Sequence, residues 1–240
     1  MTPQLTDNYM VTIAERLKSA YARIALAAKK HHRNEHDVCL LAVSKTKPTE
    51  FILAAYQHGH REFGESYVQE AVDKITQLAN YSDIVWHFIG PIQSNKTAAV
   101  AQHFDWVQSI DREKIAKRLN DQRPVTMHPL KALIQVNISL EAAKSGCHPD
   151  ELDSLAKYIQ HCPNLELRGV MAIPAKTDDP QQQIQYFEQL RACFDRLKAQ
   201  YPQIDILSMG MSGDVETAIA AGSTMVRIGT DIFGQRKGDN

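Results

Sequence analysis

Several features that mark other classes of protein are missing from this sequence of 240 residues. No apolar run is long enough to cross a membrane, and the first thirty residues lack the apolar core of a secretion signal. Four widely spaced cysteines form no Cys-x-x-Cys motif, which is typical of reduced thiols in a cytoplasmic protein. Basic and acidic residues nearly cancel, to a formal net charge of -1, and neither forms a long run. The composition therefore shows no nucleic-acid footprint and no polybasic membrane anchor.

The motifs of the common catalytic classes are missing too. The sequence has no Ser/His/Asp order, no spacing of metal ligands and no glycine fingerprint of a dinucleotide-binding fold. Any chemistry must therefore come from residues that the fold brings together.

Short apolar segments alternate with helical patterns along the chain. We expect strands at 39–45, 62–65, 84–90, 106–110, 131–138, 167–173, 206–211 and 225–229. A long amphipathic helix is expected at about 5–30, and further helices at 49–58, 67–78, 94–100, 111–120, 149–160, 180–200 and 212–221. This alternation predicts a (β/α)8 barrel in a single domain over 1–240. A doubly wound open sheet is the alternative, since alternation alone does not show closure.

Ser94, Asp111 and Ser212 each precede an expected helix and are side chains that commonly cap one. In (β/α)8 barrels the working face is the carboxyl end of the strands. That end would carry Lys45, Glu65, Gly90, Asn137, Met171, Ser212, Gly229 and Thr230.

Lys45 follows a continuous apolar run, as expected where a strand buried on both faces ends in a turn. A lysine drawn partly into an apolar interior has a lowered pKa, and its free amine can attack an aldehyde to form a Schiff base. The alternative is a lysine that extends its ammonium group to solvent at the strand end. This stretch alone favours the alternative.

Two segments near the end of the chain suit a phosphate group. Gly210 to Asp214 follows one expected strand and opens a helix, and Arg227 to Thr230 ends the last strand. Small residues let backbone N–H groups approach an anion, and barrels often bind phosphate at the turns after strands seven and eight. Ordinary turn chemistry explains Ser212 and Gly229 equally well. A lysine across the barrel from a phosphate cup is, however, the arrangement that pyridoxal 5'-phosphate needs.

The third dense patch is Trp86 to Lys96, in which His87 lies between aromatic residues of a buried strand. A histidine in that setting is more often a hydrogen-bonded core residue than a catalyst. Gln93, Asn95 and Lys96 at the following helix start can serve simply to cap and solvate it.

These motifs together resemble the YggS/PROSC family of pyridoxal phosphate-binding proteins, also called the PLP homeostasis proteins. The resemblance runs from Leu40 to Arg236. It rests on Leu41 to Pro48, on Trp86 to Val100, and on two phosphate-side segments, Ser208 to Ser212 and Val226 to Thr230. One departure is Ser66, where the family usually has Asn, which leaves that side chain's polar contact open.

The resemblance implies a barrel similar to the N-terminal domain of alanine racemase, with the cofactor on Lys45 and its phosphate near Ser212, Gly229 and Thr230. It also implies that Arg227 faces the pyridine nitrogen, where a permanent cation disfavours ring protonation. The racemase needs a second domain, and we expect none here because the chain stops soon after Gly229.

We therefore expect a cytoplasmic, monomeric barrel without appreciable turnover, which stores or delivers pyridoxal phosphate, possible recipients being apo-enzymes that depend on it. A PLP-dependent racemase-like enzyme is the alternative. Lys47 or Lys144 could supply its second acid/base group or take part in cofactor exchange, although nothing in the sequence orients either side chain.

Overall fold

Eight parallel strands form a closed barrel in the order β1-β2-β3-β4-β5-β6-β7-β8. The computed structural model describes the backbone of residues 3–141 and 144–235, with side chains from Thr12 onward, so Arg236 lies outside it. The strands are β1 (Cys39–Val43), β2 (Glu62–Glu65), β3 (Val85–Phe88), β4 (Trp106–Ile110), β5 (Leu130–Gln135), β6 (Leu165–Met171), β7 (Ile206–Met211) and β8 (Met225–Ile228). Pairing of β8 with β1, with Leu41 opposite Arg227, closes the sheet and confirms the barrel over the open sheet.

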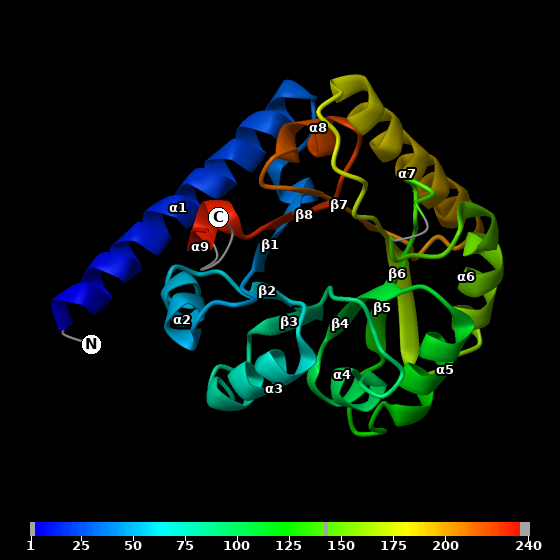
Figure 1. Ribbon diagram of the computed structural model, residues 1–240, viewed down its shortest axis with the longest axis horizontal. Helices are drawn as coiled ribbons and strands as arrows, with labels where there is room; N and C mark the ends of the chain where they lie inside the picture. Colours follow the sequence, from blue (N-terminus) through cyan, green and yellow to red (C-terminus); the bar gives the residue numbers. More distant parts are fainter. Residues whose placement is uncertain (1–2, 142–143, 236–240) are drawn as a thin grey trace.

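Helices surround the strands, as Figure 1 shows. They are α1 (Pro3–Lys30), α2 (Thr49–Gln57), α3 (Val68–Gln77), α4 (Thr97–His103), α5 (Glu113–Gln122), α6 (Leu152–Gln160), α7 (Pro180–Gln200), α8 (Val215–Ala220) and α9 (Thr230–Phe233), with short 3-10 turns at Glu35–Asp37 and Pro149–Glu151. The extra helix α1 lies outside the barrel and packs against α2, α8 and α9. No described helix is both long and apolar enough to cross a membrane.

Side chains along each strand point alternately into the barrel and out toward the helices, so the core has an inner and an outer part. In β1, Leu40 and Ala42 join the large cluster between barrel and helices, whereas Leu41 packs inside the barrel with Ile89 and Met225. A second interior group consists of Trp106, Leu133 and Met171. Because both faces of a strand are buried, the strands appear in the sequence as nearly continuous apolar runs.

Three predicted helix caps are wrong. The residues before α4, α5 and α8 are Lys96, Arg112 and Asp214, and none of them caps its helix through its side chain. Ser94, Asp111 and Ser212 lie one or two residues before these positions, in the loops that follow β3, β4 and β7. The strand-to-helix loops on this end of the barrel are therefore longer than capping signals indicate.

Candidate functional site

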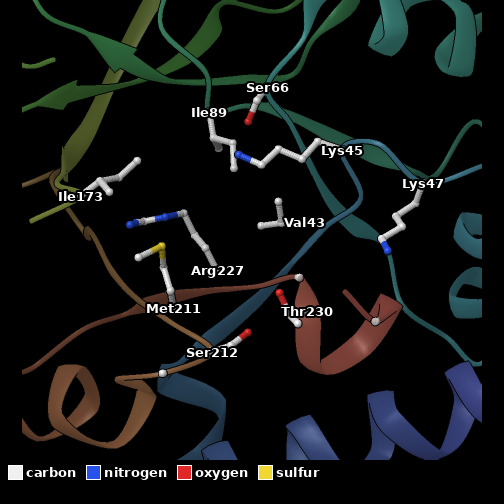
Figure 2. Close-up of a pocket in the computed structure, with 13 residues that line it drawn as sticks. Val43, Lys45, Lys47, Ser66, Ile89, Ile173, Met211, Ser212, Arg227 and Thr230 are labelled. Carbon is white, nitrogen blue, oxygen red and sulfur yellow. The ribbon is translucent and has the colours of Figure 1, made fainter. Parts of the chain in front are cut away.

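A cavity of about 200 Å³ opens at the carboxyl end of the barrel. All five predicted cofactor-binding residues line it, namely Lys45, Ser212, Arg227, Gly229 and Thr230. The rest of its lining comes from Val43, Lys47, Ser66, Ile89, Ile173, Met211, Gly213 and Gly234. Figure 2 shows the amine of Lys45 and the guanidinium of Arg227 on either side of this space.

Lys45 lies in the turn between β1 and α2, and its residue is half-buried. Its side chain reaches toward Ile89 and Ser66 (Figure 2). The next residue, Thr46, has a φ of 65°, a left-handed conformation that a residue with a branched side chain rarely adopts. Such a conformation persists only where neighbouring contacts impose it.

Those contacts come from a buried cluster centred on Lys74 of α3. Its Nζ donates to the Ser44 carbonyl at 2.8 Å, to Glu65 Oε1 at 2.8 Å and to Glu70 Oε1 at 2.6 Å. The Ser44 hydroxyl also donates to Glu65 at 2.7 Å, and Glu70 accepts the N–H of Thr46 at 2.6 Å. The backbone on both sides of Lys45 is therefore held by charged groups.

This cluster explains why Glu65 does not line the cavity although it ends β2. Glu65 is fully buried, and burial raises the pKa of its carboxyl group, an effect that Lys74 and Ser44 partly offset.

Three other residues predicted at this end of the barrel do not line the cavity either. Met171 is buried inside the barrel, and the Asn137 amide donates to the carbonyls of Glu141 and Lys144. Gly90 has a backbone role, because a Cβ there would lie 2.2 Å from the Ser66 carbonyl oxygen.

The two glycine-containing turns present free amide donors. Within residues 3–141 and 144–235, no group accepts a hydrogen bond from the backbone N–H of Ser212, Gly213, Gly229 or Thr230. The turns themselves are fixed from outside by Arg23 of α1. Its guanidinium donates to the Ser212 carbonyl at 2.7 Å and also pairs with Glu216 and Asp231. Arg23 carries no recognisable signal in the sequence, because it occupies an ordinary surface position of a helix.

The lysine and the glycine turns are neighbours rather than opposite one another, which corrects the expected arrangement across the barrel. Closure of the sheet pairs β1 with β8, so Val43 and Gly229 lie side by side. A Cβ at Gly229 would lie 3.1 Å from the Val43 carbonyl oxygen, which accounts for glycine at that position.

Arg227 is buried in the floor of the cavity, with 3% of its surface exposed. Nη1 donates to the Ser208 hydroxyl at 2.8 Å and Nη2 to the Ala172 carbonyl at 2.8 Å. No carboxylate of the described residues pairs with it, and burial lowers the pKa of the guanidinium to about 10. It thus remains a cation at neutral pH, and a group placed in the cavity would meet its charge.

Two further lysines flank the cavity. Lys47 points away from Lys45 in Figure 2, and its Nζ donates to the Gln235 carbonyl at 2.7 Å. Lys144 lines a neighbouring cavity of about 180 Å³, which shares Ile89 and Ile173 with the first. Lys47 is therefore held by the end of the described chain, whereas Lys144 lies beside the site.

His87 is a hydrogen-bonded core residue, as predicted. It is fully buried, its Nε2 lies 2.6 Å from Glu62 Oε2 and its ring stacks on Trp106 with centroids 5.2 Å apart. It is not part of the lining of the cavity.

The chemistry of the lining suits a small aldehyde that carries an anionic group. The amine can bind a carbonyl carbon, four free amides can hold an anion, and Ile89, Ile173 and Met211 can cover a flat ring. The residues present thus fit pyridoxal 5'-phosphate.

Comparison with known proteins agrees with this chemistry. The model of the alanine racemase N-terminal domain family matches residues 17–237. A pyridoxal phosphate homeostasis protein of Vibrio cholerae is 56% identical over 230 residues, which make up 95% of this chain and 98% of that protein. The structure of PipY from Synechococcus elongatus with PLP bound matches 92% of this chain and 100% of its own, with a TM-score of 0.79 at 34% identity. An alanine racemase of Corynebacterium glutamicum shares the fold, with a TM-score of 0.72 at 16% identity over 96% of this chain and 63% of its own.

Proposed function

The chain belongs to the family of pyridoxal phosphate homeostasis proteins, and from this premise we propose that its barrel binds pyridoxal 5'-phosphate and takes part in controlling the free cofactor pool. The observation that carries the proposal is a single cavity lined by the Lys45 amine, the free amides of two turns and the buried Arg227 cation. When bound, the cofactor supplies an aldehyde that reacts reversibly with amines.

Each lining group has one role in this proposal. Lys45 would hold the cofactor as a Schiff base, because its Nζ is an amine that an aldehyde in the cavity could react with reversibly. Ser212, Gly229 and Thr230 hold the phosphate, mainly through backbone N–H groups of turns that Arg23 fixes in place.

Arg227 faces the ring nitrogen in this arrangement. It is a buried lining residue of the cavity, and two of its N–H groups are held by Ser208 and Ala172. A guanidinium that stays protonated beside the nitrogen disfavours a second positive charge there. An unprotonated ring withdraws electrons poorly, which favours holding the cofactor over transforming amino acids.

The function is thus binding, storage or delivery of the cofactor by a single barrel domain that works as a monomer in a reducing compartment such as the cytoplasm. The four cysteines are free thiols, consistent with such a compartment. Delivery would involve apo-enzymes as recipients. A racemase-like enzyme remains the second candidate, and the turnover experiment described in the Discussion separates the two.

Reductive trapping on Lys45 tests the proposal. The purified protein loaded with pyridoxal phosphate should absorb near the edge of the visible range. Borohydride should then fix the cofactor on the peptide that contains Lys45, detected by mass spectrometry. Lys47→Ala is the matched control, since its lysine lines the same cavity but points away from Lys45, and it should keep the modified peptide. Persistence of the same spectrum and adduct in Lys45→Ala would show that another lysine carries the cofactor.

A further inference from the structure

A chain of hydrogen-bonded polar side chains crosses the interior of the barrel from one end to the other. It starts at Glu62, the first residue of β2, and ends at Arg227 in the cavity floor. Between them lie His87 of β3, Gln108 of β4 and Ser208 of β7, all fully buried. The successive distances are 2.6 Å from Glu62 Oε2 to His87 Nε2, 3.0 Å from His87 Nδ1 to Gln108 Nε2, 2.7 Å from Gln108 Oε1 to Ser208 Oγ and 2.8 Å from Ser208 Oγ to Arg227 Nη1.

The far end of this chain reaches solvent. Glu62 lines a second cavity of about 490 Å³, formed by part of α1 and by residues before and at the start of β1 and β2. About a third of its side chain, 32%, is exposed. The chain therefore joins a hydrated carboxylate at the amino end of the barrel to a buried cation at the carboxyl end.

Hydrogen-bonding capacity fixes the direction of every bond. A guanidinium only donates, so the Ser208 hydroxyl accepts from Arg227 and gives its own hydrogen to Gln108 Oε1. The amide nitrogen of Gln108 then donates to His87 Nδ1. A neutral imidazole that accepts at Nδ1 carries its hydrogen on Nε2, which donates to the Glu62 carboxylate.

This common direction matters for the charge of Arg227. Every group in the chain turns its acceptor toward the cation and its donor toward the carboxylate, so its dipole stabilises both charges. In a buried network such bonds strengthen one another. Within the described residues no carboxylate forms an ion pair with Arg227, although the charge of Asp214 acts to raise its pKa. The series of hydrogen bonds adds a link from the guanidinium to the carboxylate of Glu62.

We propose that Ser208, Gln108, His87 and Glu62 position Arg227 and stabilise its charge, so that the guanidinium faces the ring of the bound cofactor. These are positioning residues, because none of them lines the cofactor cavity. The part of this proposal that concerns the cofactor rests on the proposed function. The donor-to-acceptor direction of the hydrogen bonds does not depend on it.

The tautomer of His87 tests the direction of the hydrogen bonds in the protein without ligand. Nitrogen-15 NMR, with His87→Gln to assign the signals, should show hydrogen on Nε2 and a bare, accepting Nδ1. His60 is an internal reference of the same tautomer, since its Nε2 donates to the Glu62 carbonyl and its Nδ1 accepts from Tyr21. Hydrogen on Nδ1 of His87 in the wild-type protein would overturn the proposed direction.

Gln108→Glu provides a second test, because a carboxylate has no donor for His87. A hydrogen should then appear on Nδ1 as well, because Nε2 keeps its own hydrogen toward Glu62, while the His60 signals stay unchanged. If the hydrogen positions on the His87 ring are unchanged in the folded variant, the series of hydrogen bonds is not as described. If the variant does not fold, the wild-type tautomer still decides the question.

Ser208→Ala tests the effect on the ligand. It removes one bond to a charged group, which should weaken pyridoxal phosphate binding about tenfold and shift the absorption of the bound cofactor. Ser223→Ala is the matched control, since Ser223 is equally buried but donates to backbone carbonyls that do not belong to the series of hydrogen bonds leading to Arg227. Wild-type affinity and spectrum in Ser208→Ala would refute the positioning role. If the wild-type protein itself binds no pyridoxal phosphate, the proposed function fails, while the NMR result on direction stands.

Discussion

His60 is a buried histidine that the fold keeps uncharged. It is 1% exposed, and its two ring nitrogens bond the Tyr21 hydroxyl at 2.8 Å and the Glu62 carbonyl at 2.7 Å. Burial lowers the pKa of its imidazole from 6.5 to about 4. The unfolded chain therefore binds a proton more readily than the folded one does between these two values.

The contribution of neutral His60 to the free energy of unfolding should accordingly be fully present above pH 6.5 and be lost as the pH falls toward 4. The loss amounts to about 3 kcal/mol in the free energy of unfolding. Urea unfolding at a series of pH values should show this decline, and His60→Gln should reduce it. His128→Gln is the matched control, because His128 is exposed. Equal acid sensitivity of His60→Gln and the wild type would exclude this linkage.

At the scale of elements, the turn after β1 depends on α3 and β2 rather than on its own residues. Lys74 has 6% of its side chain exposed and bonds two carboxylates and one backbone carbonyl around the turn. Removing one partner of a buried ion pair leaves the other charge unpaired in a medium of low polarity. Only a variant that removes both charges avoids that cost.

Lys74→Met should therefore destabilise the fold by about 3–5 kcal/mol and lower the yield of cofactor trapped on Lys45. Lys74→Met combined with Glu65→Gln should recover much of the stability, as urea unfolding in a double-mutant cycle would measure. Lys117→Met removes a lysine from an exposed ion pair on α5 and should leave stability nearly unchanged. Similar losses from both Lys→Met variants would contradict the special role of Lys74.

The turns before α8 and α9 act through backbone amides, and this predicts which cofactor form binds. Charge-assisted hydrogen bonds contribute about 1.5–3 kcal/mol each, so pyridoxal without phosphate should bind at least about a hundredfold more weakly. Titration followed by absorbance measures both affinities. Ser212→Ala and Thr230→Ala keep their N–H groups and should preserve most of this preference. Loss of the preference in these variants would assign it to the hydroxyl groups, and equal binding of both forms would refute the phosphate site.

Elements with strong patterns could be predicted from the sequence. The bounds of α7 and β7 agree with Pro180–Gln200 and Ile206–Met211, because proline opens the helix and the strand is a continuous apolar run. The starts of α4, α5 and α8 were misplaced, since Ser94, Asp111 and Ser212 suit loops as well as caps. The four-residue α9 was missed because it is too short to show a helical period.

At the scale of the whole molecule, closure of the barrel accounts for what the sequence could not show. Ser208 and Gln108 are 100 residues apart, and single polar residues within apolar strands carry no signal of their pairing. Their contact requires that both side chains point into the same barrel interior. The same closure places the end of β1, just before Lys45, beside Gly229. The predicted order of strands placed both residues at the carboxyl end of the barrel but did not show that they are neighbours.

The open cavity predicts binding without appreciable turnover of amino acids. Its rim is exposed, with Ile173 37% and Met211 40% accessible, so water reaches the space where catalysis would need a dry, preorganised site. Among its described lining residues the ionisable side chains are Lys45, Lys47 and Arg227. Lys47 points away and Arg227 stays protonated, which leaves Lys45 as the one group suited to proton transfer.

A positioned acid or base contributes about 10²–10⁴-fold to a rate. The described lining residues offer no second such group, which should cost most of a racemase's activity. We expect the loaded protein, incubated with L-alanine in D2O, to exchange the α-proton at a rate close to that of free pyridoxal phosphate. Proton NMR follows the exchange, and chiral chromatography follows racemisation. Lys45→Ala with added cofactor is the control, because any exchange that persists in it arises from the cofactor in solution. If exchange occurs near the typical enzymatic rate of about 10 s⁻¹ and is lost in Lys45→Ala, the protein is a racemase-like enzyme. Storage of the cofactor does not require removal of the α-proton.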